Sequence, residues 1–201
     1  FGELTAEPTR FDGYETLSEK ARVLALSDGE ELVDAIATDE AGEVKEGVLV
    51  VLDKTPFYAE MGGQVADHGY LVSGDAKLKV TQVKKTPKGY FVHTCELLDG
   101  TIHVEDEVTA SVDEKRRAAI CRNHTATHLL QKALREVLGE HVHQAGSYQD
   151  DRLTHFDFTH FSAVTPAELA EVERRVNEKI YEALPVTVKN LPIEEAKKMG
   201  A

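Results

Sequence analysis

Apolar residues recur at helical spacing through residues 116–138, and we take this stretch as the element around which the chain is organised. The spacing i, i+3, i+4, i+7 is typical of an amphipathic helix with one buried face. Asp113 is suited to cap its N-terminus and Gly139 to end it. The apolar positions are Ala119, Ile120, Ala126, Leu129, Leu130, Ala133, Leu134, Val137 and Leu138.

Residues 31–112 carry short runs of strand-forming residues separated by turn-forming residues. The clearest run is residues 77–83, where polar and apolar residues alternate with the period of a half-buried strand. Several short strands at close spacing predict a small barrel or sandwich. We expect strands at residues 22–26, 47–52, 70–72, 77–83, 90–95 and 107–112.

Two further strand runs follow the predicted helix, at residues 141–148 and 153–158. A turn at residues 150–152 would join them into a hairpin. In the first run His141 and His143 alternate with an apolar residue, so both are expected on one face of the strand.

The last part of the chain predicts helices. Thr165 and Glu168 form a capping-box pattern around Pro166, which is favoured at the first helical position. We expect a short strand at residues 186–189 and a last helix at residues 193–199. The apolar face of the helix that follows Thr165 comprises Leu169, Val172, Val176, Ile180 and Leu184.

These elements predict an α+β fold with two subdomains. Residues 1–20 are expected to be a connector, and residues 21–112 a small N-terminal β-barrel. Residues 113–201 are expected to form an α/β core in which helices pack on an antiparallel sheet. The chain begins with Phe rather than Met, which suggests a piece of a longer protein.

Composition and charge exclude several classes of protein. No apolar run approaches the roughly 20 residues of a membrane span, and no signal-peptide pattern opens the chain. Two cysteines make no disulfide framework, which favours a reducing, cytoplasmic setting. The net charge of −13 argues against a general polyanion binder. Residues 1–50 hold 13 acidic and 4 basic side chains, so the acidity is concentrated there.

His124 and His128 are the first candidates for chemistry. Four residues apart on a helix, they share one face, so two imidazoles can converge on a zinc ion. A bare pair of this kind is more often structural. Zinc needs four ligands, or three and a water. Cys121 could be a third ligand or a small buried hydrophobe. The other possible sources in the chain are His141, His143, His155 and His160.

Gly62, Gly63 and Gln64 form a second distinctive stretch. Paired glycines permit a tight or left-handed backbone and close approach of a ligand, although an isolated Gly-Gly is more often a structural β-turn. Arg116 and Arg122 belong to a local basic run, which is usually a solvated helix face and less often a nucleic-acid contact.

Three separated blocks resemble the editing domain of alanyl-tRNA synthetase and the related free-standing alanyl-tRNA editing proteins. The first is NHTATHLL at residues 123–130, and the second is TPFYAEMGGQVADHG at residues 55–69. The third runs from the HQAGS of residues 143–147 to the RLTHFDF of residues 152–158. The resemblance covers nearly the whole chain.

The resemblance implies an activity: hydrolysis of the ester in tRNA(Ala) mischarged with serine or glycine. It implies His124 and His128 as zinc ligands and catalytic residues, with Gln144 lining the pocket. It associates the loop of Gly62, Gly63 and Gln64 with tRNA, and the basic residues Arg116 and Arg122 are further candidate tRNA contacts. The family's remaining zinc ligands, a Cys and a His, are expected beyond residue 201. ATP would belong only to an upstream aminoacylation domain.

A second site of this kind has a physical purpose. An alanine pocket cannot exclude the smaller glycine sterically, and one added hydroxyl gives only about 10²-fold rejection of serine. Zinc would polarise the ester carbonyl or activate a water, or instead position the substrate's amino group. Two other readings stay open: a non-catalytic tRNA-binding module, or a metallohydrolase of another ester using Cys121 or His141. The sequence leaves the oligomeric state open.

Overall fold

The computed structural model describes residues 4, 6–38 and 42–199 of the chain. The described residues fall into two compact units. The first holds the chain up to His128 together with Gln144–Thr159, and the second holds Leu129–His143 and the residues from His160 onwards.

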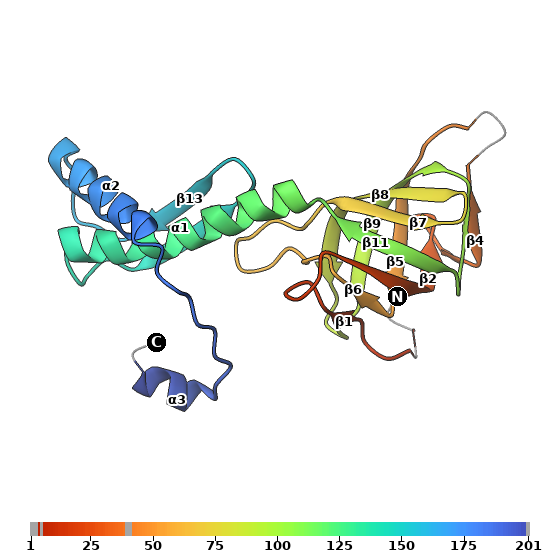
Figure 1. Cartoon of the computed structure of the whole chain (residues 1–201), viewed down its shortest axis with the longest axis horizontal. Helices are drawn as coiled ribbons and strands as arrows, with labels where there is room; N and C mark the ends of the chain where they lie inside the picture. Colours follow the sequence, from red (N-terminus) through yellow and green to blue (C-terminus); the bar gives the residue numbers. More distant parts are fainter. Residues whose placement is uncertain (1–3, 5, 39–41, 200–201) are drawn as a thin grey trace. The chain divides into compact units, whose positions relative to one another are not determined.

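The helices are α1 (Glu114–Leu138), α2 (Pro166–Tyr181) and α3 (Ile193–Lys198) (Figure 1). The strands are β1 (Arg10–Phe11), β2 (Ser18–Ser27), β3 (Leu32–Val33), β4 (Ala35–Ala37), β5 (Lys45–Leu52), β6 (Lys54–Thr55), β7 (Gly69–Ser73), β8 (Ala76–Lys85), β9 (Phe91–Asp99), β10 (Thr101–His103), β11 (Glu107–Val112), β12 (Gln144–Gln149) and β13 (Thr154–Phe158).

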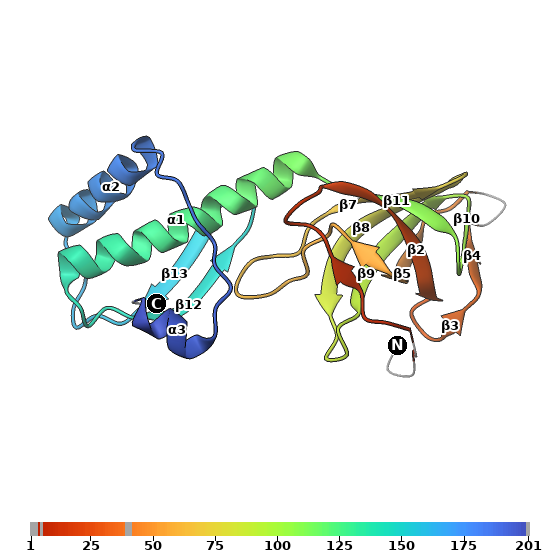
Figure 2. The same ribbon diagram turned by 60° about the horizontal axis from the view of Figure 1, so that its bottom comes forward.

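Six strands of the first unit close into a barrel. Antiparallel neighbours follow the order β11-β7-β8-β9-β5-β2, and β2 pairs back with β11. β3 pairs antiparallel with the end of β2, β4 pairs antiparallel with β10, and β1 pairs in parallel with β6. Figure 2 shows the strands wrapping around a common interior. The α+β fold with an N-terminal barrel is therefore confirmed.

The barrel interior follows from period-2 alternation, with one break. Leu78 and Val80 of β8 are fully buried, as alternation predicts. The register between β8 and β9 then shifts between Val80 and Gln82, so Val83 enters the core in place of Gln82. A bulge of this kind lets an apolar side chain take a position that strict alternation would give to an amide.

His93 of β9 is a polar side chain inside this core. It is fully buried; its Nδ1 donates to the carbonyl of Val50 at 3.0 Å, and its Nε2 accepts from the Thr55 hydroxyl at 2.8 Å. A carbonyl oxygen can only accept, so this arrangement requires the neutral ring with its proton on Nδ1. Burial lowers the pKa of His93 to about 4.

Acid should therefore destabilise the barrel. The unfolded chain binds a proton at His93 near pH 6.5 while the folded chain does not until about pH 4, so stability falls as the pH drops through this window. The contribution amounts to ~3 kcal/mol. Urea denaturation between pH 4.5 and 7 measures it. We expect His93→Gln to flatten the pH dependence, and an unchanged slope would contradict this role.

The predicted connector at residues 1–20 contains part of the barrel. Arg10–Phe11 forms β1, and β2 begins at Ser18, well before the strand expected at residues 22–26. The first residues of β2 form a strand because Glu19 to Arg22 pair with β11. Local sequence cannot predict such long-range pairing, which extends a strand beyond its apolar centre.

Helix α1 begins two residues before the expected range and ends at the expected residue. The Asp113 side chain accepts a hydrogen bond from the backbone N–H of Arg116 at 3.0 Å, which confirms the N-cap. Gly139 follows the helix with a φ of 120°, in a backbone region that favours glycine.

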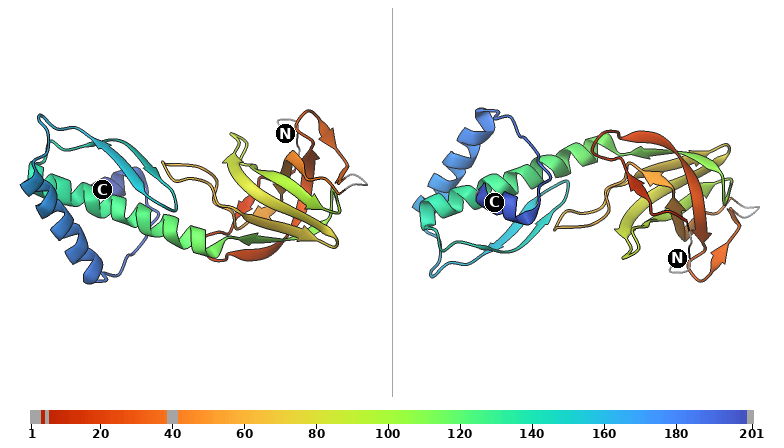
Figure 3. Two further views of the ribbon diagram at one scale, coloured as in Figure 1. Left: turned by 90° about the horizontal axis from the view of Figure 1, so that it is seen from above. Right: turned by 90° about the horizontal axis from the view of Figure 1, so that it is seen from below.

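The hairpin of β12 and β13 packs on the first half of α1. Asn123 donates to the carbonyl of Asp150 at 2.8 Å, and the hydroxyls of Thr127 and Thr154 are 2.6 Å apart. Figure 3 shows the hairpin beside the helix. The expectation that His141 and His143 lie on the strand is wrong, because β12 begins only at Gln144. Both histidines lie in the loop that precedes β12.

The boundary between the two units differs from the one expected after residue 112. It falls within α1, because the helix up to His128 and the β12–β13 hairpin group with the barrel. The guanidinium of Arg117 is one cause: it is 9% exposed, pairs with Asp67 and also donates to the carbonyl of Gly13 at 2.6 Å.

In the second unit, α2 opens with the predicted capping box of Thr165 and Glu168. The helix ends at Tyr181, and α3 lies within the range expected for the last helix. The strand expected at residues 186–189 is wrong: Val186 and Val188 are 80% and 83% exposed, with no partner strand among the described residues. Among all the residues that the structure describes, no helix is long and apolar enough to cross a membrane.

Candidate functional site

His124 and His128 lie together on one face of α1, as their spacing predicts. Their ring centroids are 5.3 Å apart and the ring planes differ by 11°, so the two imidazoles stack. His124 is half-buried and His128 is exposed. The pair therefore presents two ring edges together, with His128 open to a ligand.

Gln64 contacts the first of these histidines. Its amide oxygen Oε1 lies 2.6 Å from Nδ1 of His124, and the side chain is only 6% exposed. An amide oxygen can only accept, so Nδ1 of His124 must carry the proton. The lone pair is then on Nε2, the nitrogen left available for a ligand.

The local environment favours a neutral His124. Partial burial lowers the pKa of its imidazole, and the neighbouring His128 lowers it further. Neutral imidazole is the form that ligates metals or acts as a base. The lowered pKa thus agrees with the hydrogen bond that His124 donates to Gln64, because together they leave Nε2 with a free lone pair.

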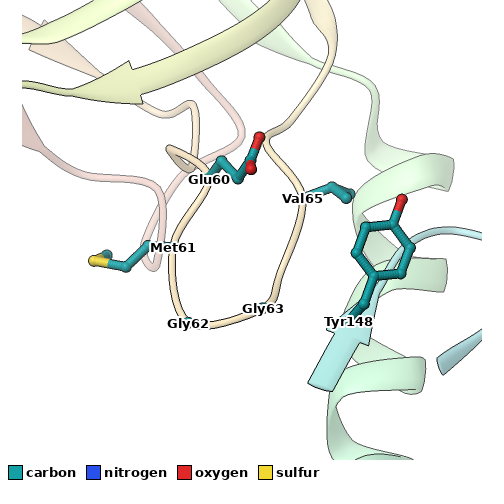
Figure 4. Close-up of a pocket in the computed structure, with 6 residues that line it drawn as sticks. All are labelled: Glu60, Met61, Gly62, Gly63, Val65 and Tyr148. Atoms are coloured by element: carbon teal, nitrogen blue, oxygen red, sulfur yellow. The ribbon is translucent and has the colours of Figure 1, made fainter. Parts of the chain in front are cut away.

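The glycine-rich loop that carries Gln64 is a tight turn. Met61 and Gln64 exchange two backbone hydrogen bonds, of 3.2 and 3.1 Å, around Gly62 and Gly63. Both glycines have positive φ, 61° and 84°. Figure 4 shows these glycines at the tip of the loop and Tyr148 of β12 on the side of Val65. A hollow of about 190 Å³ lies here, lined by Glu60, Met61, Gly62, Gly63, Val65 and Tyr148.

The other face of this loop contacts the strand that carries Gln144. A Cβ on Gly63 would lie 2.5 Å from the backbone oxygen of Ser147. The Ser147 hydroxyl in turn accepts a hydrogen bond from the amide nitrogen of Gln144 at 3.0 Å. Gln144 is exposed. The loop therefore touches the surroundings of both His124 and Gln144.

We expect alanine to lower the free energy of unfolding by different amounts at the two glycines. Gly63→Ala combines a left-handed backbone with a steric clash, and we expect a loss of ~2–4 kcal/mol in unfolding free energy. Gly62→Ala, where no atom lies within 4 Å of the new Cβ, should cost only ~1 kcal/mol. Chemical denaturation of both variants measures the difference. Equal losses would show that the contact with Ser147 is not tight.

The two arginines predicted to contact tRNA lie in different settings. Arg116 donates to the carbonyl of Ala66 at 2.7 Å and lies 3.3 Å from a carboxylate oxygen of Asp151. Its side chain is 16% exposed. Arg122 is exposed on α1. Their role toward tRNA, like that of the loop, stays a prediction.

The described residues contain no group of three or more His, Cys, Asp or Glu side chains placed to hold a metal ion. Cys121 is exposed rather than buried. Nε2 of His155 lies 3.0 Å from Oδ1 of Asp157, and Nε2 of His141 lies 2.9 Å from Nδ1 of His160. The donor set thus fits half of a zinc shell: two imidazoles, one of them oriented by a hydrogen bond of the kind that supports metal ligands.

Sequence reasoning did not predict two contacts that shape this site. One is the hydrogen bond between Gln64 and His124, and the other is the buried ion pair of Arg117 with Asp67. Both join residues at least 50 positions apart, beyond the reach of local periodicity. The one available signal was the position of a polar Gln directly after two glycines.

Comparison with known proteins places this chain in a family. Residues 2–116 match the family model described as tRNA synthetases class II (A), which covers more than half of the chain. The chain belongs to this family. The match ends at the start of α1, so the two histidines and the β12–β13 hairpin lie beyond it.

Relatives within this synthetase family extend the similarity to nearly the whole chain. The alanine–tRNA ligase of Acetivibrio thermocellus is 49% identical over 193 residues, which is 96% of this chain and 21% of the ligase. That of Bacillus subtilis is 45% identical over 199 residues, 99% of this chain and 22% of the ligase. The chain thus spans about a fifth of the length of these synthetases.

Proposed function

We propose that this chain is part of the proofreading site of an alanine–tRNA ligase. The reaction is hydrolysis of the ester that joins serine or glycine to the 3′ end of tRNA(Ala). The observation that carries the proposal is the stacked pair His124 and His128, in which Nδ1 of His124 donates a hydrogen bond to Gln64. The relatives named alanine–tRNA ligase supply the substrate class.

Each residue has a separate task in this proposal. His124 and His128 present imidazole nitrogens to the reacting end of the substrate. Gln144, exposed beside Ser147, hydrogen-bonds the substrate in the pocket. Arg122 and the tip of the glycine-rich loop contact the tRNA backbone. Arg116, which is tied to Ala66 and Asp151, contributes positive charge nearby.

Zinc is the cofactor that we propose for the histidine pair. When bound, it supplies a Lewis acid that polarises a carbonyl or lowers the pKa of a water. His124 and His128 would hold it together with a Cys and a His from outside this chain. Gln64 orients the imidazole of His124 and leaves its Nε2 available, whatever completes the shell.

The test compares esters on a single tRNA. A full-length alanine–tRNA ligase carrying this sequence is mixed with Ser-tRNA(Ala), Gly-tRNA(Ala) and Ala-tRNA(Ala), and release of the amino acid is followed in single turnovers. We expect the serine and glycine esters to be hydrolysed much faster than the alanine ester. Equal rates for all three would contradict a proofreading role.

A second candidate function is a tRNA-binding module without catalysis of its own. One observation favours it for the 201-residue chain: no three metal-binding side chains come together among the described residues. On this view the isolated chain binds tRNA(Ala) but releases no serine, whereas the full-length ligase does. Hydrolysis by the isolated chain, abolished by His128→Ala, would exclude this candidate.

A further inference from the structure

The side chain of Gln64 faces the protein and not the solvent. It is 6% exposed, and its Oε1 lies 2.6 Å from Nδ1 of His124, a short hydrogen bond. This contact selects one of the two neutral forms of the ring, with the proton on Nδ1 and the lone pair on Nε2. Without such a partner, a histidine side chain in water favours the opposite form.

Backbone pairing holds Gln64 in this position from both sides. On one side the turn is closed by the hydrogen bonds between Met61 and Gln64. On the other, Val65 donates to the carbonyl of Gln149 at 3.1 Å, and Gln149 donates to the carbonyl of Gly63 at 2.9 Å. The glycine-rich loop is thus attached to β12 by an isolated parallel bridge between Gln64 and Gln149.

The same loop also supports the strand that carries Gln144. Gly63 lies so close to Ser147 that any side chain there would displace it, and Ser147 accepts the hydrogen bond from Gln144. One turn therefore contacts His124 directly and Gln144 through Ser147. Rigid support of this kind fixes a functional group to within fractions of an ångström.

We propose that Gln64 is a positioning residue that fixes the tautomer of His124 and so directs Nε2 toward the ligand. The purpose of this role rests on the proposed function, but the experiment that tests it does not. Gln64 acts through His124, and the solvent-facing contact of the loop with tRNA belongs to the exposed Gly62 instead.

The experiment reads the tautomer directly, by imidazole 15N NMR on the 201-residue chain without metal or tRNA, at about pH 8. The His124 signal is assigned by its loss in His124→Ala. We expect the proton on Nδ1 in the unsubstituted chain. Gln64→Glu, which keeps an acceptor, should retain this form, whereas Gln64→Met, of similar length, should shift most of the population to the Nε2–H form.

A second readout uses the metal. In the full-length ligase, Gln64→Met should weaken zinc binding by about 10–100-fold, as loss of a partner to a metal-bound histidine does, and Gln64→Glu should weaken it less. A proton on Nε2 of His124 in the unsubstituted chain would overturn the positioning role, and this outcome does not depend on the folding of any Gln64 variant. So would an unchanged tautomer in Gln64→Met. Failure of the proofreading function alone would leave the NMR result intact.

Discussion

Replacing His128 by Ala in a full-length alanine–tRNA ligase that carries this sequence should lower the rate of Ser-tRNA(Ala) hydrolysis by about 10²–10⁴-fold. His128 is the exposed member of the stacked pair, so it presents its ring to a ligand at little cost to the fold. Loss of a group that orients or activates a reactant at the ester has this magnitude. His124→Ala should have a similar effect.

Thr125→Ala is the matched control for this prediction. Thr125 is exposed on the same turn of α1, next to His124, and alanine is a better helix former. Its hydrolysis rate should equal that of the unsubstituted ligase. Single-turnover release of serine measures all three variants. Hydrolysis by His124→Ala and His128→Ala at the rate of the control would remove the chemical basis of the proposed function.

The largest effect on stability should come from Arg117→Ala. The single Nε–H of the guanidinium is shared between the two carboxylate oxygens of Asp67, each 3.0 Å away, and Nη2 also donates to this carboxylate. Nη2 donates in addition to the carbonyl of Pro56 at 3.0 Å. Asp67 is 1% exposed. Removing the partner leaves a buried, uncompensated carboxylate, which costs ~3–5 kcal/mol. Chemical denaturation measures the loss.

Two further variants separate the ion pair from general damage to the helix. Arg122→Ala removes an exposed arginine one turn further along α1 and should change the unfolding free energy little. In the double variant Arg117→Ala/Asp67→Ala the buried charge is gone, so part of the loss should be recovered. A double variant as unstable as the sum of the single changes would show that the two side chains act independently.

Elements with strong local signals could be predicted from sequence alone. The ends of α1 follow from Asp113 and Gly139, and the start of α2 follows from its capping box. The barrel strands were predicted because apolar runs and glycine-containing turns alternate. Capping residues and apolar runs both act within about one helical turn or one strand, where residues close in sequence are also close in space.

Features that depend on distant partners could not be predicted. The strand expected at residues 186–189 has a suitable composition but no partner strand in the described part of the chain. The bulge in β8 and the early start of β2 depend on pairing with other strands. At the site, the spacing of the histidines predicted that they share one helix face, whereas Gln64, the partner of His124 from 60 residues away, has no local signal.

The central claim is that His124 and His128 are half of a zinc site. X-ray absorption at the zinc edge of the full-length ligase, with metal content per chain, tests it most directly. We predict one zinc with imidazole ligands, whose imidazole number falls by one in His124→Ala and in His128→Ala, and loss of zinc in the double variant. Zinc retained with an unchanged set of ligands in the double variant would contradict the account.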